Sequence, residues 1–273
     1  MLDLLQYTFF RNALTGSVFT CISCGIAGAY IVSRRMVFIS GGITHASFGG
    51  LGLGFYTGIS PILSALLFSV ASAFGIEWLT KKQDVREDSA IAAFWALGMA
   101  LGVICIFLTP GYAPNISSYL FGNILTITFS DIGFAGALAV LLSVLFMLFF
   151  KPILYTAFDS EFAKTQGVKV ALIEHLMMLA IAVTIVSSIR LIGIMLLMSL
   201  LTVPQMTANL FTSRFHKIIL YSIGFSIIGC FSGLFLSYYL NIPSGAAIIF
   251  VQTILFLLCK TALFLYQRTI KLS

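Results

Sequence analysis

Residues 171–212 read ALIEHLMMLAIAVTIVSSIRLIGIMLLMSLLTVPQMTANLFT, an almost unbroken apolar stretch. As a single helix these about 42 residues would be about 63 Å long, twice the hydrocarbon thickness of a bilayer. The stretch therefore predicts two membrane crossings joined by a turn. Arg190, followed by Gly193, marks that turn. A charge at the bilayer centre costs about 2.5 to 3.5 kcal/mol, and placing Arg190 at an external hairpin removes this cost.

The same apolar character extends over the whole chain. Of its 273 residues, 60% are hydrophobic and 9% are charged, and the mean hydropathy is +1.08. A soluble domain carries about 25% charged residues. The composition excludes a soluble catalytic domain, a Rossmann domain and a nucleic-acid-binding protein, so we expect no nucleic-acid partner. The 15 Lys and Arg exceed the 9 Asp and Glu, and the basic residues lie in short connections, where they indicate topology.

Alternation of basic and uncharged connections predicts nine membrane crossings, with the amino end outside and the carboxyl end inside. If the first run, about residues 13–33, lies in the membrane interface instead, eight crossings remain. No cleavage site follows this run, so we expect it to be retained. The predicted cytoplasmic segments are residues 81–88, 152–170 and 213–217, and the predicted external ones are 110–117, 190 and 241–244.

The predicted fold is thus an all-α polytopic integral membrane protein of eight or nine transmembrane helices, with residues 1–273 forming a single transmembrane domain. Two spans carry helix-breaking residues. In SGGITHASFGGLGLG (40–54), Gly41 and Gly42 predict a broken helix whose backbone lines a cavity. Pro204 predicts a second break, which would free the carbonyls of Leu200 and Leu201 to face a pore.

His45 is the titratable residue that most clearly points to function. It lies about seven residues into an apolar span, beside Thr44, Ser40 and Ser47. An ionisable residue inside a membrane span is a functional hypothesis by default, here a metal ligand or a gate. The structural alternative is a neutral imidazole that is hydrogen-bonded between two helices.

The longest polar interruption is PILYTAFDSEFAKTQGVKV, residues 152–170, which we expect to be the main cytoplasmic feature. Asp159 or Ser160 can cap a short helix there, Glu161 falls in its first turn and Gly167 ends it. No Gly-Lys pair occurs anywhere in the sequence. The chain therefore has no P-loop through which to bind ATP.

Five segments carry a resemblance to a known family. Together they resemble, in order and nearly end to end, the permease subunit of the ABC-3 family of ATP-driven zinc, manganese and iron importers. The resemblance implies that the chain is not an enzyme and that ATP is hydrolysed on separate ABC ATPase subunits. It also implies an extracytoplasmic metal-binding protein and a second permease copy in a homodimer. The segments are RRMVFISGGITHAS (34–47), SYLFGNIL (118–125), FDSEFAKTQGV (158–168), IRLIGIMLLMSLLTVPQMTANLFT (189–212) and NIPSGAAIIF (241–250).

The resemblance also assigns roles to residues. Residues 158–168 resemble the helix that docks on the ATPase, with Glu161, Ala163 and Gly167 as contact and shape positions. His45 matches the family's histidine on the second span, but the aspartate usual four residues earlier is replaced by Gly41. Three other residues are expected to compensate as donors of a metal pathway: Thr44 beside His45, Asn123 at a position where the family often has Asn or Asp, and Gln205 after Pro204, where the family more often has alanine.

We expect no permanently bound cofactor. A divalent metal ion would be the transported substrate, with zinc favoured and manganese or iron as alternatives, because imidazole suits several transition metals alike.

Two other classes of function stay open. A secondary metal transporter or a channel, working without an ATPase, would also use a glycine-rich span but would need no docking loop. An intramembrane protease would use Ser47 with His45, but residues two apart on a helix do not face each other.

Overall fold

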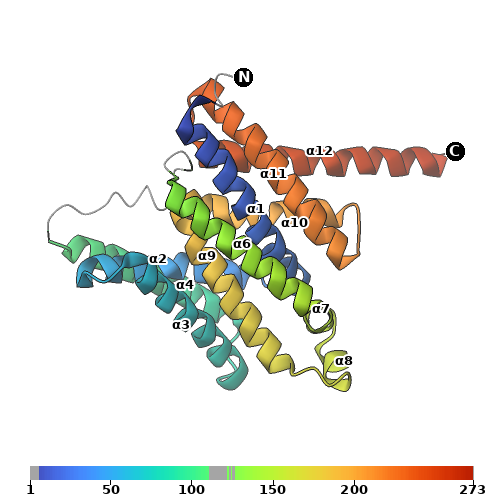
Figure 1. Ribbon diagram of the computed structural model, residues 1–273. Coiled ribbons are helices and arrows are strands. Elements are labelled where there is room, and N and C mark those ends of the chain that lie inside the picture. Colours follow the sequence, from blue (N-terminus) through green and yellow to red (C-terminus); the bar gives the residue numbers. More distant parts are fainter. Residues whose placement is uncertain (1–5, 111–121, 123, 125–126, 273) are drawn as a thin grey trace. The chain divides into compact units, whose positions relative to one another are not determined.

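The computed structural model describes residues 6–110, 122, 124 and 127–272 and is helical throughout its long elements (Figure 1). The helices are α1 (Thr8–Ser33), α2 (Val37–Thr57), α3 (Pro61–Lys82), α4 (Glu87–Leu108), α6 (Phe129–Leu148), α7 (Phe150–Phe158), α8 (Ser160–Thr165), α9 (Val170–Leu200), α10 (Val203–Asn209), α11 (Phe215–Leu240) and α12 (Ser244–Leu272).

The predicted all-helical membrane fold is confirmed. Eight segments of the described chain are long and apolar enough to cross a membrane, and α9 with α10 supplies two of them, Val170–Ile189 and Leu191–Asn209. The helix α2 is not among the eight, since its glycines, serines and histidine lower its hydropathy. With α2 included, the helices coincide with the nine predicted apolar runs.

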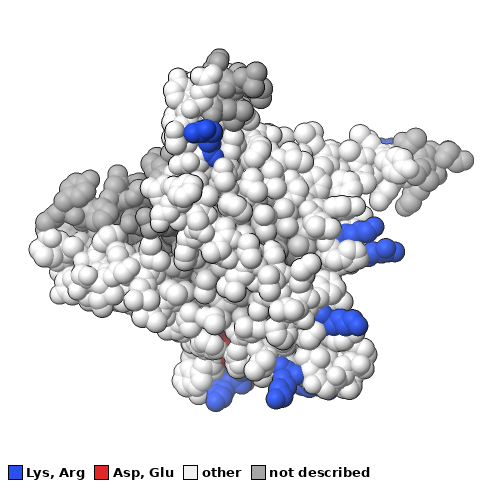
Figure 2. All heavy atoms as spheres, in the orientation of Figure 1, with Lys and Arg blue, Asp and Glu red and all other residues white. Residues whose placement is uncertain are grey.

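The surface also fits a lipid environment. Large apolar side chains are widely exposed, among them Phe107 (90%), Phe129 (84%) and Met147 (84%). In Figure 2 most of the visible atoms belong to uncharged residues, and lysine and arginine side chains appear in a few separate groups. Contiguous apolar surface of this extent marks a membrane-facing protein, because a soluble monomer keeps such patches small.

The predicted interruption of the stretch 171–212 is at Gly193. This glycine has φ 77° and ψ 166°, outside the helical region, within an otherwise helical α9. A second interruption follows, since α9 ends at Leu200 and α10 begins at Val203, with Pro204 in its first turn. Proline fits a first turn because its missing N–H would have no partner there in any case.

The chain forms two compact units, each built from separate stretches of sequence. Unit 1 comprises Met1–Val32, Phe121–Phe149 and Leu191–Ser273, and unit 2 comprises Ser33–Leu120 and Phe150–Arg190. The boundary between the two units falls within α9. The assignment of residues 1–273 to one domain stays a prediction.

In unit 2 the helix α2 packs closely on both α3 and α4 (Figure 1). A Cβ at Gly49 or Gly52 would lie within 3 Å of backbone atoms of Gly98 or Gly102 on α4. A Cβ at Gly50 would collide with the backbone of Ala65 on α3. Such glycine faces let helices approach until dispersion contacts form along their backbones.

The predicted break at Gly41 and Gly42 is wrong. The helix α2 is uninterrupted from Val37 to Thr57, and neither glycine adopts a positive φ. Instead, a Cβ at Gly42 would meet the side chain of Ile91, 2.7 Å away. Glycine inside a helix costs about 1 kcal/mol relative to alanine, and close packing against the neighbouring helices offsets that cost.

Unit 1 is organised around α1. A Cβ at Gly25 would overlap Ile223 of α11, and Gly28 lies against Gln205 of α10. About 72% of the apolar window of α1 is buried. A helix lying in the membrane interface would bury one face only, so this packing favours α1 as a spanning helix and disfavours the eight-crossing alternative.

Candidate metal pathway and docking helix

His45 stands on α2 in unit 2, partly buried among apolar neighbours. Its imidazole stacks on the indole of Trp95 from α4, with ring centroids 4.0 Å apart and an interplanar angle of 8°. The Nδ1 atom is buried and has no hydrogen-bond partner among the described residues. The alternative of an imidazole hydrogen-bonded between helices therefore finds no support at Nδ1.

The hydroxyl groups beside His45 are engaged within their own helix. The Thr44 hydroxyl donates to the carbonyl of Ser40 at 2.6 Å, and the Ser47 hydroxyl donates to the carbonyl of Thr44 at 2.6 Å. Both side chains are fully buried. Thr44 thus retains only acceptor capacity, and the pairing of Ser47 with a backbone carbonyl does not prepare it as a nucleophile.

The position one turn before His45 supplies no ligand, because it is Gly41. Among the described residues no group of three or more His, Cys, Asp or Glu side chains is arranged to hold a metal ion. An ion at His45 would therefore rely on one imidazole, on neutral oxygens and on water. This is a weak donor set, suited to passage rather than to storage.

The other two predicted donors lie outside the described part of unit 2, to which His45 belongs. Asn123 lies outside the described residues. Gln205 belongs to unit 1, where its Nε2 donates to the carbonyls of Cys24 and Leu200 at 3.0 and 3.1 Å. It is fully buried and holds α10 against α1. Since the Leu200 carbonyl accepts from Gln205, it is not free for a pore, although the Gln205 Oε1 has no described partner.

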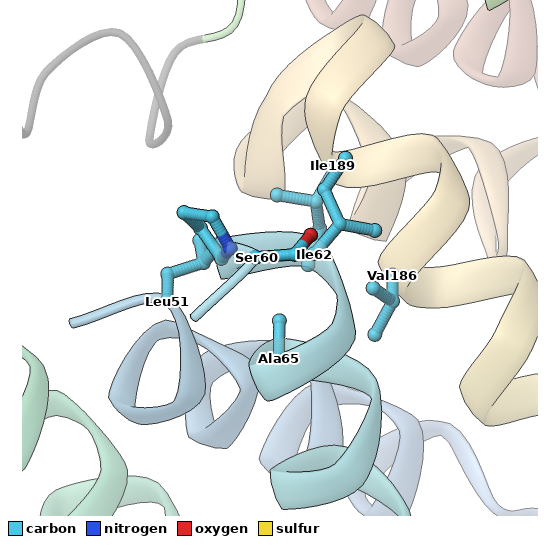
Figure 3. Close-up of a pocket in the computed structure, with 7 residues that line it drawn as sticks. Leu51, Ser60, Ile62, Ala65, Val186 and Ile189 are labelled. Carbon is cyan, nitrogen blue, oxygen red and sulfur yellow. The ribbon is translucent and has the colours of Figure 1, made fainter. Parts of the chain in front are cut away.

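A cavity of about 230 Å³ lies within unit 2, and His45 and Thr44 are not among the residues that line it (Figure 3). Its walls come from α2, α3, α9 and the residue before α3. Ser60 gives the one polar side chain among its lining residues. The lining residues are Leu51, Ser60, Pro61, Ile62, Ala65, Val186 and Ile189.

The predicted short helix within residues 158–168 is α8, Ser160–Thr165. Asp159 caps it, because its Oδ1 accepts the backbone N–H groups of Glu161 and Phe162 at 3.0 and 2.9 Å. Gly167 ends it in the left-handed region, at φ 74°. Residues 152–170 contain more helix than we expected from the sequence, because α7 precedes α8. The two helices are in contact, since the ring of Tyr155 on α7 packs edge to face on the ring of Phe162 on α8.

The three predicted docking positions have different roles in this segment. Ala163 is fully buried and accepts the N–H of Val168 at 3.0 Å, so it closes the turn from inside. Glu161 is exposed and pairs with Lys164 at 2.7 Å. A Cβ at Gly167 would meet no atom within 4 Å, so this glycine is required by backbone conformation alone.

An ionic cluster beside this segment was missed by the sequence reasoning. Arg34 pairs with Glu174 at 2.5 Å and donates to the carbonyl of Thr156 at 2.9 Å, and Lys81 pairs with Glu174 at 3.3 Å. In the sequence, Arg34 has the pattern of a basic residue that sets topology, and Glu174 has the pattern of a solvated residue at the start of a helix. Only the pair of Lys81 with Glu77, at 2.8 Å and four residues apart, has a signal in the sequence.

Comparison with known proteins gives consistent matches over nearly the whole chain. Residues 6–262 match the ABC 3 transport family. An uncharacterized membrane protein of Synechocystis sp. is 38% identical over 258 residues, covering 94% of this chain and 92% of that protein. The manganese transport system membrane protein MntC of Listeria monocytogenes is 32% identical over 253 residues, covering 93% and 90%.

A solved structure matches to the same extent. A chain of PsaBC from Streptococcus pneumoniae, in complex with Fab, superposes with a TM-score of 0.86 at 28% identity, covering 94% of this chain and 93% of that one.

Proposed function

The chain belongs to the ABC 3 transport family, and from that premise we propose that it is the membrane permease subunit of an ATP-driven importer of a divalent transition-metal ion. The single observation that carries the proposal is the family match over residues 6–262. The match covers every predicted span before α12 and extends into α12. The exposed apolar surface and the eight candidate spans support a multi-pass permease.

We rank manganese first as the transported ion. Relatives 32% and 29% identical to this chain are named for manganese transport or import. The ranking rests on these relatives, because the imidazole of His45 suits zinc and iron, whereas the neutral oxygens and water beside it suit manganese. Zinc, favoured from the sequence, and iron are the competing substrates.

The helix α8 would couple ATP hydrolysis to transport. The sequence has no P-loop, so ATP must be bound by separate ABC ATPase subunits. The capped, exposed helix α8 resembles the helix of such permeases that docks on the ATPase. The preceding helix α7 is linked to the ionic cluster, because Arg34 donates to the carbonyl of Thr156. In this arrangement α8 and the carboxyl terminus lie in the cytoplasm.

The complete importer would contain two copies of the permease, two ATPase subunits and an extracytoplasmic metal-binding protein that delivers the ion. The permease would sit in the cytoplasmic membrane as a homodimer. Of these proposed partners, the lipid bilayer is the one that the exposed apolar side chains of the described chain support directly.

The test is copurification of the tagged chain from its own host, followed by ATP hydrolysis in lipid nanodiscs. We expect an ATPase subunit to copurify and the metal-loaded binding protein to stimulate hydrolysis. A chain that accumulates metal with no associated ATPase would instead be a secondary transporter or a channel. Measuring the stimulation with manganese, zinc and iron separately ranks the three ions.

A further inference from the structure

We propose that unit 1 binds one anionic phospholipid of the cytoplasmic leaflet, with an acyl chain in a groove along α11 and the phosphate headgroup held by Arg214 and Lys217. The inference goes beyond the proposed transport function and does not depend on which ion is carried. It is carried by an open apolar groove that continues the helix face of two basic residues.

The groove is formed by the first half of α11 and by the turn that precedes this helix. It has a volume of about 500 Å³ and is open to the surface. The rings of Phe211, from the turn, and Phe225 are stacked there, with centroids 5.7 Å apart and an interplanar angle of 24°. No lysine, arginine, aspartate or glutamate is among the lining residues, which suits a hydrocarbon chain. These residues are Phe211, Leu220, Tyr221, Gly224, Phe225 and Ile228.

Two basic residues lie at the end of the groove where α11 begins. Lys217 is four, seven and eleven positions before Tyr221, Gly224 and Ile228, so it shares their helix face. Arg214 immediately precedes the helix and is exposed. A long basic side chain beside apolar surface keeps its charged end at the membrane surface. The groove therefore has an apolar floor and a basic end.

These two basic side chains have no acidic partner. Within the described part of the chain, neither Arg214 nor Lys217 forms an ion pair. The sequence contains no Asp or Glu after Glu174, so α10, α11 and α12 supply no carboxylate. Basic pockets at the cytoplasmic membrane surface bind anionic headgroups, which supply the charge that the chain lacks here.

The groove also matches one leaflet in depth. Ile228 is 11 positions after Lys217, and at about 1.5 Å per residue the two lie about 16 Å apart along the helix axis. The hydrocarbon core of a bilayer is about 30 Å thick, so one leaflet contributes about 15 Å. An acyl chain that starts beside Lys217 therefore ends near the bilayer centre beside Ile228.

Charge favours a lipid over a second copy of the chain as the occupant. A twofold interface places the same patch of both copies face to face. Arg214 and Lys217 would then meet their like-charged counterparts, with no carboxylate from α10, α11 or α12 between them. Juxtaposed like charges weaken an interface, whereas a phosphate headgroup is attracted by them.

Fluorescence quenching by brominated lipids tests the site. Tyr221→Trp, combined with Trp78→Phe and Trp95→Phe, places the only tryptophan in the groove, since the chain has 2 tryptophans. The full chain is reconstituted in vesicles that contain brominated phosphatidylglycerol or brominated phosphatidylcholine, whose bromine atoms quench tryptophan on contact. Phe250→Trp in the same background is the matched reporter, because Phe250 is 60% exposed on α12 and does not line the groove.

We expect phosphatidylglycerol to bind at position 221 about 5-fold more strongly than phosphatidylcholine, as one basic residue near a membrane surface provides. At position 250 we expect no preference, and Arg214→Gln with Lys217→Gln should abolish the preference at position 221. Equal binding of the two lipids at position 221 would overturn the proposal. Absence of quenching by both lipids would show that a second copy covers the groove, which would also overturn it.

Native mass spectrometry decides the matter if the tryptophan variants do not fold. The otherwise unmodified full chain is equilibrated in detergent with equal amounts of phosphatidylglycerol and phosphatidylcholine, and the bound lipids are counted. We expect Lys217→Gln to retain one phosphatidylglycerol fewer than the unmodified chain. Lys260→Gln is the control, since Lys260 is exposed on α12, and it should retain the same number. Equal retention by the two variants would contradict the site.

Discussion

Arg34 and Glu174 form an ion pair of 2.5 Å, and they join the segment before α2 to the first turns of α9. Their side chains are only 25% and 20% exposed. The second guanidinium nitrogen of Arg34 donates to the carbonyl of Thr156 on α7 at 2.9 Å. One side chain therefore links α9 to the helix that leads into α8, the segment proposed to receive the ATPase.

We predict that Arg34→Gln destabilises this corner and weakens docking of the ATPase. Loss of a partly buried charged hydrogen bond costs about 1.5 to 3 kcal/mol, so the thermal midpoint of the purified protein falls by several degrees and less ATPase copurifies. The matched control is Arg86→Gln, since Arg86 pairs with Asp88 at 2.7 Å on an exposed surface. Exposed pairs contribute about 0 to 1 kcal/mol. Equal effects of the two variants would contradict this role.

Gly167→Val is predicted to uncouple transport from ATP hydrolysis or to release the ATPase. The cause is backbone strain alone, because Gly167 has φ 74° and a Cβ there would touch nothing within 4 Å. A β-branched residue in the left-handed region costs about 1 to 3 kcal/mol. Gly224→Val is the control, since Gly224 also faces open space but has no positive φ. Uptake and complex yield are measured for both, and normal values for Gly167→Val would refute the docking role of α8.

His45→Ala is predicted to lower metal uptake strongly while the complex still assembles. The imidazole is the only titratable side chain at this point of α2, so no neighbouring group replaces it. His216→Ala serves as control, because His216 is exposed at the start of α11. Uptake of radioactive manganese, zinc and iron is compared at equal complex yield. Unchanged uptake in His45→Ala would return this histidine to a structural role.

Gly41→Asp is predicted to make the site hold metal more tightly and to slow turnover. A carboxylate one helical turn before His45 adds the charged oxygen ligand that the site lacks, and a divalent charge is costly to bury without a paired charge. Bound metal is measured in the purified variant alongside its uptake rate. A variant that retains no more metal than the unmodified protein would show that position 41 does not face the ion.

Local sequence was enough to predict the apolar spans and the short helix α8. Each depends on contacts within a few residues: apolar runs of span length, the cap at Asp159 and the left-handed stop at Gly167. The helix α7 was missed because residues 150–158 stand next to a polar segment and are too short to span. The break predicted at Gly41 and Gly42 was wrong because helix propensity does not include the packing of α3 and α4 on α2.

The contacts between residues far apart in the chain could not be predicted from the sequence. Arg34 and Glu174 are 140 positions apart, and each alone has the pattern of a solvated charge at a helix end. The stack of His45 on Trp95 depends on the register between α2 and α4, which is set by the glycine contacts of the two helices. Gln205 has the sequence pattern of a polar group in a pore, but its amide donates to the carbonyl of Leu200, at the end of α9, and to the carbonyl of Cys24 on α1.

The predicted orientation is tested by labelling single cysteines in a cysteine-free background with a reagent that does not cross membranes. Ile242 lies just after the end of α11 and is 39% exposed. A cysteine at this position should react from outside. Gln83 and Thr165, both exposed, should react only after the membrane is opened. Ala113, predicted to be external, lies outside the described residues. Labelling of Thr165 in intact cells would invert the orientation and place α8 on the wrong side for an ATPase.

The most direct test of the central claim is manganese accumulation by proteoliposomes that contain the permease with its copurified ATPase and are loaded with ATP. We predict that radioactive manganese accumulates against its gradient when the external metal-binding protein is added, that a non-hydrolysable ATP analogue stops the accumulation, and that His45→Ala lacks it. Accumulation that persists without ATP, or its absence for manganese, zinc and iron alike, would contradict an ATP-driven metal importer.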